Sequence, residues 1–277
     1  MVQKTFGIYS EKEEHCRFFI EIGEQHMACW TLSVDYGAWN AFELFRLPDT
    51  TEKKSYEALF AEVKLVSALI GRSYAATQVI WENPDAVCIP GKYFSEDLLD
   101  KYAETVIGAT RGTVPKYAAL DDKNVLYVVN SNRLKVVEQQ FPGAEHFHKQ
   151  QLLLKSGQQY KNTDSKKSQV QLLFYEGHFL LAAYQQDQLQ LIRSFAYETP
   201  EDVVYHLLNT ASLSALNLPK TVFSIAGLID LDSSLYAELY KYIPILQVER
   251  ADDRMFNNEA FSEYPSHYFI PFFKYVV

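Results

Sequence analysis

The sequence predicts a mixed α/β protein built from two copies of one unit. Residues 16–82 run as three β segments, a long amphipathic helix and a further β segment. Residues 169–227 repeat this order at similar spacings. Alternating apolar residues between short polar breaks are typical of antiparallel strands, whereas apolar residues three and four positions apart are typical of a helix. We therefore expect two similar subdomains with mixed sheets that flank a cleft.

The first copy has short polar breaks between its strands and a longer helical segment before its last strand. Pro48 ends the third strand, because proline cannot donate to a strand ladder. A helix at this point allows the last strand to lie parallel to the first one through a right-handed crossover. The expected elements are strands at 16–24, 26–34 and 39–47, a helix at 55–71 and a strand at 77–81.

The second copy has the clearer signals. Thr199 is a suitable N-cap, Pro200 suits the first helical position, and acidic residues occupy the first turn that follows. The expected elements are strands at 169–176, 178–186 and 188–197, a helix from residue 199, a strand at 220–227, a helix at 233–242 and a strand at 245–249.

The region between the copies is less regular. A helix at 96–108, a strand at 124–131 and a helix at 133–141 are expected, followed by a polar stretch without periodicity. We therefore divide the chain into a first subdomain at 1–153, a polar linker or loop at 154–168 and a second subdomain at 169–277.

Composition restricts the classes of partner. The 26 basic and 35 acidic residues give a net charge of −9 with no basic stripe, which argues against nucleic acid. No segment reaches the roughly 18 apolar residues of a membrane span, so we expect no membrane insertion. Cys16, Cys29 and Cys88 form no paired motif and are typical of free thiols in a reducing cytoplasm, which predicts a cytoplasmic protein.

Three glycine-containing turns adjoin strands of the two copies. In the first copy, Glu21–Ile22–Gly23–Glu24–Gln25 follows the first strand. In the second copy, Phe174–Tyr175–Glu176–Gly177–His178 takes the same place. The third turn, Ala226–Gly227, ends the strand that follows the long helix of the second copy.

The element order and these turns resemble the duplicated actin-like ATPase fold, which is related to ribonuclease H. More narrowly, the chain resembles an uncharacterised bacterial family of that fold, a domain of unknown function. The resemblance covers about residues 16–110 and 169–250 and implies a nucleotide cleft between the two subdomains.

The resemblance also implies roles for particular residues if the site is active. Backbone N–H groups of the two hairpin turns would hold ATP phosphates, and an acid beside the first turn would place Mg²⁺. The implied residues are Glu21 as the catalytic acid, Gly23, Gln25 and Gly177 at the phosphates, and Gly227 against the adenine base.

The turns also depart from the pattern of the superfamily, in which Asp-x-Gly precedes a small residue. Glu21 replaces the aspartate, and Glu24 replaces the small residue, where its carboxylate repels phosphates unless Mg²⁺ intervenes. Glu176–Gly177 is explained equally well as a tight hairpin turn.

We therefore expect a degenerate member of the fold, a non-catalytic binding or scaffolding module that uses no cofactor. The alternative is a divergent ATPase or small-molecule kinase that uses ATP and Mg²⁺ in the cleft. A nuclease of the ribonuclease H type is disfavoured, because it needs several inward carboxylates and only Glu21 stands at a suitable place.

Two further features are weighed against simpler explanations. His146 and His148 face the same way on a strand, but no second cluster supplies ligands, so we expect a surface pair and no metal site.

The aromatic segment 261–277 is expected to pack on the core as a final strand. The alternative for this segment is an exposed surface that docks a partner or forms a homodimer. Whether the ligand is a protein or a small molecule stays open.

Overall fold

The computed structural model describes residues 1–9, 15–48, 54–159, 168–256 and 258–276. The chain divides into two compact units. The first comprises Met1–Gln151 and Asp252–Glu263, and the second comprises Leu152–Ala251 and Tyr264–Val277. The predicted end of the first subdomain at 153 lies close to this division. Most of the predicted linker 154–168, namely residues 160–167, lies outside the described residues.

The segment 252–263 belongs to the first unit, although the sequence places it in the second subdomain. The reason is a set of long-range contacts near its middle. Phe256 forms a β-bridge with Trp39, and the Asn258 amide donates to the backbone oxygens of Tyr9 at 2.8 Å and Asn40 at 3.3 Å. Contacts across so many residues leave no local signal in the sequence.

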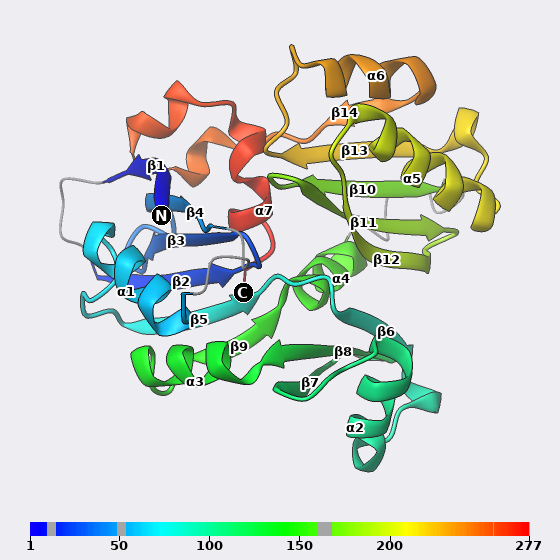
Figure 1. The fold of residues 1–277 in the computed structure, drawn as a ribbon. Helices are drawn as coiled ribbons and strands as arrows, with labels where there is room; N and C mark the ends of the chain where they lie inside the picture. The colour runs from blue at the N-terminus through cyan, green and yellow to red at the C-terminus, as the bar shows by residue number, and fades with distance from the viewer. Residues whose placement is uncertain (10–14, 49–53, 160–167, 257, 277) are drawn as a thin grey trace. The chain divides into compact units, whose positions relative to one another are not determined.

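The first unit contains a six-stranded sheet (Figure 1). Its strands are β1 (Gln3–Ile8), β2 (Cys16–Ile22), β3 (His26–Ser33), β4 (Trp39–Arg46), β5 (Ala76–Trp81) and β9 (Glu145–His148). Their order in the sheet is β1-β4-β3-β2-β5-β9. β2 pairs antiparallel with β3 and parallel with β5, as the crossover requires. The edge strand β1 has no counterpart in the sequence-based expectation.

Two helices pack against the core of this sheet. They are α1 (Tyr56–Val66), which connects β4 to β5, and α3 (Ser131–Gln140), which precedes β9. α1 contributes the buried residues Phe60 and Val63, and α3 contributes Leu134 and Val137. These apolar residues recur at helical spacing, which is why the sequence predicts both helices.

An insertion between β5 and α3 forms a separate three-stranded sheet in the order β6-β8-β7. Its elements are β6 (Ala86–Pro90), β7 (Thr113–Ala119), β8 (Lys123–Asn130), the short helix α2 (Leu99–Tyr102), a π-helical turn at Ala103–Ile107, and 3₁₀ turns at Gly91–Tyr93 and Glu96–Leu98. The sequence predicts β8 and one helix at 96–108, but neither β6 nor β7. β7 carries Pro115, which an edge strand tolerates and a strand pattern does not reveal.

The second unit repeats the first sheet. Its strands are β10 (Gln169–Phe174), β11 (His178–Gln185), β12 (Gln188–Ala196), β13 (Val222–Gly227) and β14 (Leu246–Val248), in the order β12-β11-β10-β13-β14. This order matches β4-β3-β2-β5-β9 strand for strand, with the same parallel pairing of β10 with β13. The predicted duplication is therefore confirmed.

The helices of the second unit follow the same plan. They are α5 (Pro200–Leu213), α6 (Ser234–Tyr242) and α7 (Ile270–Phe273). The helix α4 (Lys149–Gln159) follows β9 directly and extends into the stretch that the sequence predicts as a polar linker. α5 begins as predicted, since Thr199 Oγ1 accepts from the Asp202 N–H at 3.3 Å and the Asp202 carboxylate accepts from the Thr199 N–H at 2.9 Å. In the described part of the chain, no helix is both long and apolar enough to cross a membrane.

The aromatic C-terminal segment is helical, so the expectation of a final strand is wrong. It forms 3₁₀ turns at Glu259–Glu263 and Ser266–Phe269 and then α7, whose first turn accommodates Pro271. The predicted core packing is confirmed by the burial of Phe269, Phe272, Phe273 and Tyr275. A homodimer through this segment stays a prediction.

Gly227 is required by the packing of two strands. It pairs with Phe174 across the parallel strands and has a φ of 95°. A Cβ on Gly227 would lie 2.1 Å from the backbone oxygen of Phe174, far inside van der Waals contact. A side chain at this position is therefore excluded by the backbone of β10 itself.

Gly227→Ala should lower the free energy of unfolding by roughly 2–4 kcal/mol, because it adds a steric clash to the strain of a positive φ. Gly37→Ala is the matched control, since Gly37 has a φ of 63° and no neighbour within 4 Å of an added Cβ. Urea denaturation measures both variants. Equal losses for the two variants would show that the close approach to Phe174 has no energetic weight.

Candidate functional site

Buried polar side chains gather at the carboxyl ends of the parallel strands of the first unit. Glu21 lies near the end of β2, Glu82 follows β5, and His148 and Lys149 stand at the end of β9. All four are at most 2% exposed. Ligands of α/β sheets bind at the carboxyl ends of parallel strands, so this cluster is the candidate functional site of the unit.

The Glu21 carboxylate is held by two partners. Lys149 Nζ lies 2.6 Å from Glu21 Oε2, and His26 Nε2 lies 3.1 Å from Glu21 Oε1. The Lys149 ammonium supplies the positive charge that a fully buried carboxylate needs. The two oxygens of Glu21 thus have different partners, one on α4 and one at the start of β3. The sequence identifies Glu21 but gives no sign of Lys149, which lies 128 residues away.

The first predicted phosphate turn is shaped by His26. The Gly23 N–H donates to the His26 backbone oxygen at 3.0 Å, and a Cβ on Gly23 would lie 2.3 Å from the His26 ring. The Gly23 oxygen accepts from Arg133 at 3.4 Å. Gln25 is exposed, and its backbone oxygen accepts from the Leu47 N–H at 2.7 Å. The glycine is therefore needed to admit the histidine ring, and its N–H already has a partner within the turn.

The second predicted turn is a tight hairpin. The Tyr175 N–H donates to the His178 oxygen at 2.9 Å, Gly177 has a φ of 75°, and the Tyr197 N–H donates to the Gly177 oxygen at 2.9 Å. The rings of Tyr175 and His178 stack at 4.8 Å with an interplanar angle of 2°. This geometry confirms the hairpin explanation of Glu176–Gly177. The positive φ accounts for the glycine without a ligand.

The two copies differ at the acid. β2 ends at Ile22 and β10 ends at Phe174, so the residue that corresponds to Glu21 in the second unit is Leu173. Leu173 is 1% exposed and belongs to the apolar interior of its unit. At this strand position the first copy therefore carries a buried carboxylate and the second copy a leucine.

His148 is buried and neutral. Its ring stacks on Tyr127 at 4.7 Å, and its Nδ1 accepts from the Gln150 N–H at 3.2 Å. Burial lowers the pKa of His148 to about 4, although the nearby Glu82 carboxylate opposes this shift. His148 and His146 were predicted as a surface pair, but His148 is an interior residue because β9 lies against the insertion that supplies Tyr127. Within the described ranges, no group of three or more His, Cys, Asp or Glu side chains is arranged to hold a metal ion.

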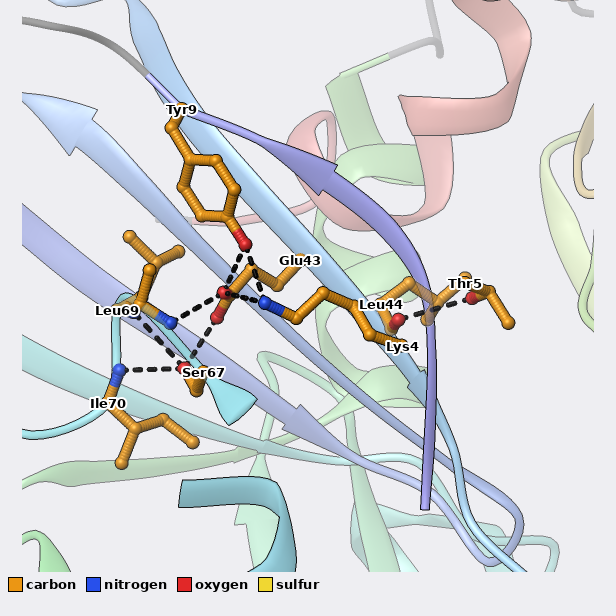
Figure 2. A network of polar contacts seen from close by, with 9 residues as sticks. Lys4, Thr5, Tyr9, Glu43, Leu44, Ser67, Leu69 and Ile70 are labelled. Carbon is orange, nitrogen blue, oxygen red and sulfur yellow. Dashed lines mark hydrogen bonds and ion pairs between the residues drawn. The ribbon is translucent and has the colours of Figure 1, made fainter. Parts of the chain in front are cut away.

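A further buried carboxylate, Glu43 on β4, was not singled out by the sequence. Its oxygens accept from Tyr9 Oη at 2.6 Å, Lys4 Nζ at 3.1 Å, the Ala68 N–H at 2.8 Å and Ser67 Oγ at 2.5 Å (Figure 2). Ser67 Oγ in turn accepts from the N–H groups of two residues that follow it, Leu69 and Ile70. Glu43 thus connects β1, β4 and the end of α1, and these four hydrogen bonds point to a structural role.

The match to a known family decides the identity. Residues 8–246 match the family described as "Protein of unknown function (DUF3822)". The chain belongs to this family. A comparison of this DUF3822 protein with curated proteins gave no match.

Solved structures show the fold of this DUF3822 protein. A protein of unknown function with an actin-like ATPase fold from Bacteroides thetaiotaomicron is 16% identical, with a TM-score of 0.74 over 85% of this chain and 91% of that one. A chain of the PilM-PilN type IV pilus biogenesis complex is 13% identical, with a TM-score of 0.57 over 91% of this chain and 95% of that one. The predicted actin-like ATPase fold is thus confirmed, and these low identities carry nothing beyond the fold.

Lys149→Met should lower the free energy of unfolding by roughly 3–5 kcal/mol, because it leaves the buried Glu21 carboxylate without its cation. The double variant Glu21→Gln/Lys149→Met should recover most of this loss, since no buried charge remains. Lys92→Met, at an exposed position, serves as the control for loss of a lysine. Chemical denaturation measures all three variants, and a Lys149→Met protein as stable as the wild type would refute the charge compensation.

His148 should make the protein less stable in mild acid. Its pKa is about 4 in the folded state against an ordinary 6.5, so between these values the unfolded chain binds the proton and the folded chain does not. The contribution of neutral His148 to the free energy of unfolding is complete above pH 6.5 and is lost as the pH falls towards 4. At 1.36 kcal/mol per pH unit, the free energy of unfolding should fall by up to about 3 kcal/mol over this range.

His148→Asn keeps a hydrogen-bond acceptor and should flatten this pH dependence while lowering stability at neutral pH. His15→Asn, at an exposed position, should keep the wild-type slope. Denaturation midpoints measured across this pH range separate the two variants. An unchanged slope in His148→Asn would contradict the assignment.

Proposed function

We propose that this protein is a non-hydrolysing member of the actin-like ATPase fold that acts as a binding or scaffolding module. The observation that carries the proposal is the buried Glu21–Lys149 ion pair. A catalytic acid that places Mg²⁺ must be reachable by the ion, whereas Glu21 is fully buried and already has an ammonium group 2.6 Å away. A magnesium ion would have to displace Lys149 and leave it buried without its partner, which is costly.

The phosphate turns support the same proposal. The Gly23 N–H bonds within its own turn, and the exposed Glu24 adds a negative charge next to it. In the second unit the residue that corresponds to Glu21 is the apolar Leu173. The two features that bind triphosphate in such folds are free backbone N–H groups and a metal-binding acid, and neither is favoured by these turns.

A binding role also agrees with the solved structures. The PilM-PilN chain has a similar fold and belongs to a complex between two proteins, as its description states. Fold likeness at 13% identity supports this role by analogy only. We further propose that the protein acts in the cytoplasm, because Cys16, Cys29 and Cys88 are free thiols. The proposal includes a binding partner, and both a protein and a small molecule are compatible with it.

One observation favours the alternative of a divergent ATPase or small-molecule kinase. Glu82 is a second buried carboxylate at the carboxyl end of β5, close enough to His148 to oppose the lowering of its pKa. Glu82 and the neutral His148 are groups that can accept a proton from water or a hydroxyl group, as a hydrolase or kinase requires. In this alternative Glu21 places Mg²⁺, and Gly23, Gln25, Gly177 and Gly227 hold ATP.

The wild-type protein should show neither heat of binding for Mg²⁺-ATP or Mg²⁺-ADP at millimolar concentration nor Mg²⁺-dependent release of phosphate. Titration calorimetry and a phosphate assay measure these two quantities. Glu21→Gln preserves the shape of the carboxylate, and Glu24→Gln, at the exposed neighbouring position, is its matched control. ATP turnover that Glu21→Gln abolishes and Glu24→Gln leaves intact would overturn the proposal in favour of the alternative.

A further inference from the structure

The first unit has a hollow of about 350 Å³ whose walls come from three elements. Lys116 contributes from β7, Glu138 from α3 with Phe141 just beyond its end, and Ala144 and His146 from the turn before β9 and from β9 itself, with Gly143 in the same turn. Figure 1 shows these three elements together in the green part of the chain. The volume is within the range of small-molecule sites, and none of the turns that resemble a nucleotide site contributes to it.

In the His146 ring, the hydrogen bond to Trp81 determines which nitrogen carries the hydrogen. The Trp81 indole N–H donates to His146 Nδ1 at 3.3 Å, and an indole nitrogen can only donate. The neutral ring therefore carries its hydrogen on Nε2. Burial lowers the pKa of His146, and the nearby Lys116 lowers it further, so the ring is neutral at pH 7. His146, one of the lining residues, thus has a fixed N–H donor at Nε2.

The two charged residues of the hollow have opposite signs and are not neutralised locally. Within the described part of the chain, neither Lys116 nor Glu138 has an ion-pair partner within 4 Å. Both act on the His146 ring, since Lys116 lowers its pKa and Glu138 raises it. Lys116 and the His146 N–H attract a negative group, and Glu138 attracts a positive one.

The apolar wall of the hollow is held in place by the core of the unit. The Phe141 ring packs against Phe18 at 5.8 Å and against Phe60 at 6.0 Å, so its position is set by the core of the unit. Gly143 has a φ of 78° and no atom within 4 Å of an added Cβ, which leaves the space beside the turn open. Walls that are fixed before binding reduce the entropic cost of association.

From this arrangement we propose that the hollow binds a small zwitterion with an apolar side chain, of the chemical class of a free α-amino acid. Lys116 and the His146 N–H receive the carboxylate, Glu138 receives the ammonium group, and Phe141 with Ala144 contacts the side chain. A simple anion is disfavoured by Glu138, and a simple cation is disfavoured by Lys116. This site goes beyond the proposed binding role and does not depend on it, because it uses neither Glu21 nor any of the glycine turns.

The test uses the full-length protein and three probes that differ by one charged group. They are L-phenylalanine, 3-phenylpropionate without the ammonium group and phenethylamine without the carboxylate. NMR titration at millimolar concentration should show binding of L-phenylalanine, with each truncated probe weaker by roughly tenfold or more, the usual effect of losing a charge-assisted contact. Binding of none of the three probes, or equal binding of all three, would overturn the proposal.

Charge-removing variants assign the contacts. Lys116→Met should weaken L-phenylalanine by roughly tenfold without weakening phenethylamine, because it removes a like charge from that cation. Glu138→Gln should likewise weaken L-phenylalanine without weakening 3-phenylpropionate. Lys92→Met and Glu104→Gln remove exposed charges of the same kinds in the insertion and should leave all affinities unchanged. Thermal melting confirms that each variant is folded. Unaltered L-phenylalanine affinity in both Lys116→Met and Glu138→Gln would rule out the hollow as the site.

Discussion

The parallel pairing of the first and last strands of each repeat is the constraint on which the architecture depends. In both units the crossover helix returns the chain beside the first strand, as β2 with β5 and β10 with β13. This pairing brings the carboxyl ends of strands together and so determines where polar groups can meet. It also brings the backbone of Phe174 against Gly227 so closely that only glycine fits. Strand packing is therefore sufficient to explain Gly227, although this glycine resembles part of a nucleotide site.

Two buried carboxylates in the first unit show how differently such groups can be stabilised. Glu43 accepts hydrogen bonds from four donors on two segments, and its role is to connect both segments to β4 (Figure 2). Glu21 relies on one ammonium group and one imidazole. Desolvation makes an isolated buried charge costly, so each carboxylate determines which residues must surround it. At Glu21 this requirement is met by Lys149, whose ammonium group lies 2.6 Å from Glu21 Oε2.

The duplicated units have diverged in a way that bears on function. The corresponding hairpins keep a histidine at the start of the second strand, His26 in one unit and His178 in the other. His26 lies against Gly23 and donates to Glu21, whereas His178 stacks on Tyr175. The same turn thus holds a buried histidine–carboxylate contact in one unit and an aromatic stack in the other. Membership of the DUF3822 family and the actin-like fold name no activity.

The sequence by itself determined the repeated order of strands and helices, because hydrophobic periodicity, Pro48 and the Thr199 cap are local signals. It also determined that Gly177 lies in a tight hairpin. It missed β6 and β7, whose short segments contain proline and half-buried residues without alternation. It predicted a strand for the C-terminal segment, where aromatic residues are compatible with either a strand or a short helix.

Only the tertiary structure decided which groups meet. Lys149 beside Glu21, Tyr127 against His148, and Lys116 across from Glu138 are all separated by many residues in the chain. The state of each buried acid or histidine depends on the charges and the burial around it, and these arise only when the strands pair. Residue types and spacing therefore sufficed for the duplicated core of the fold, whereas the chemistry of the site depended on distances that no local pattern encodes.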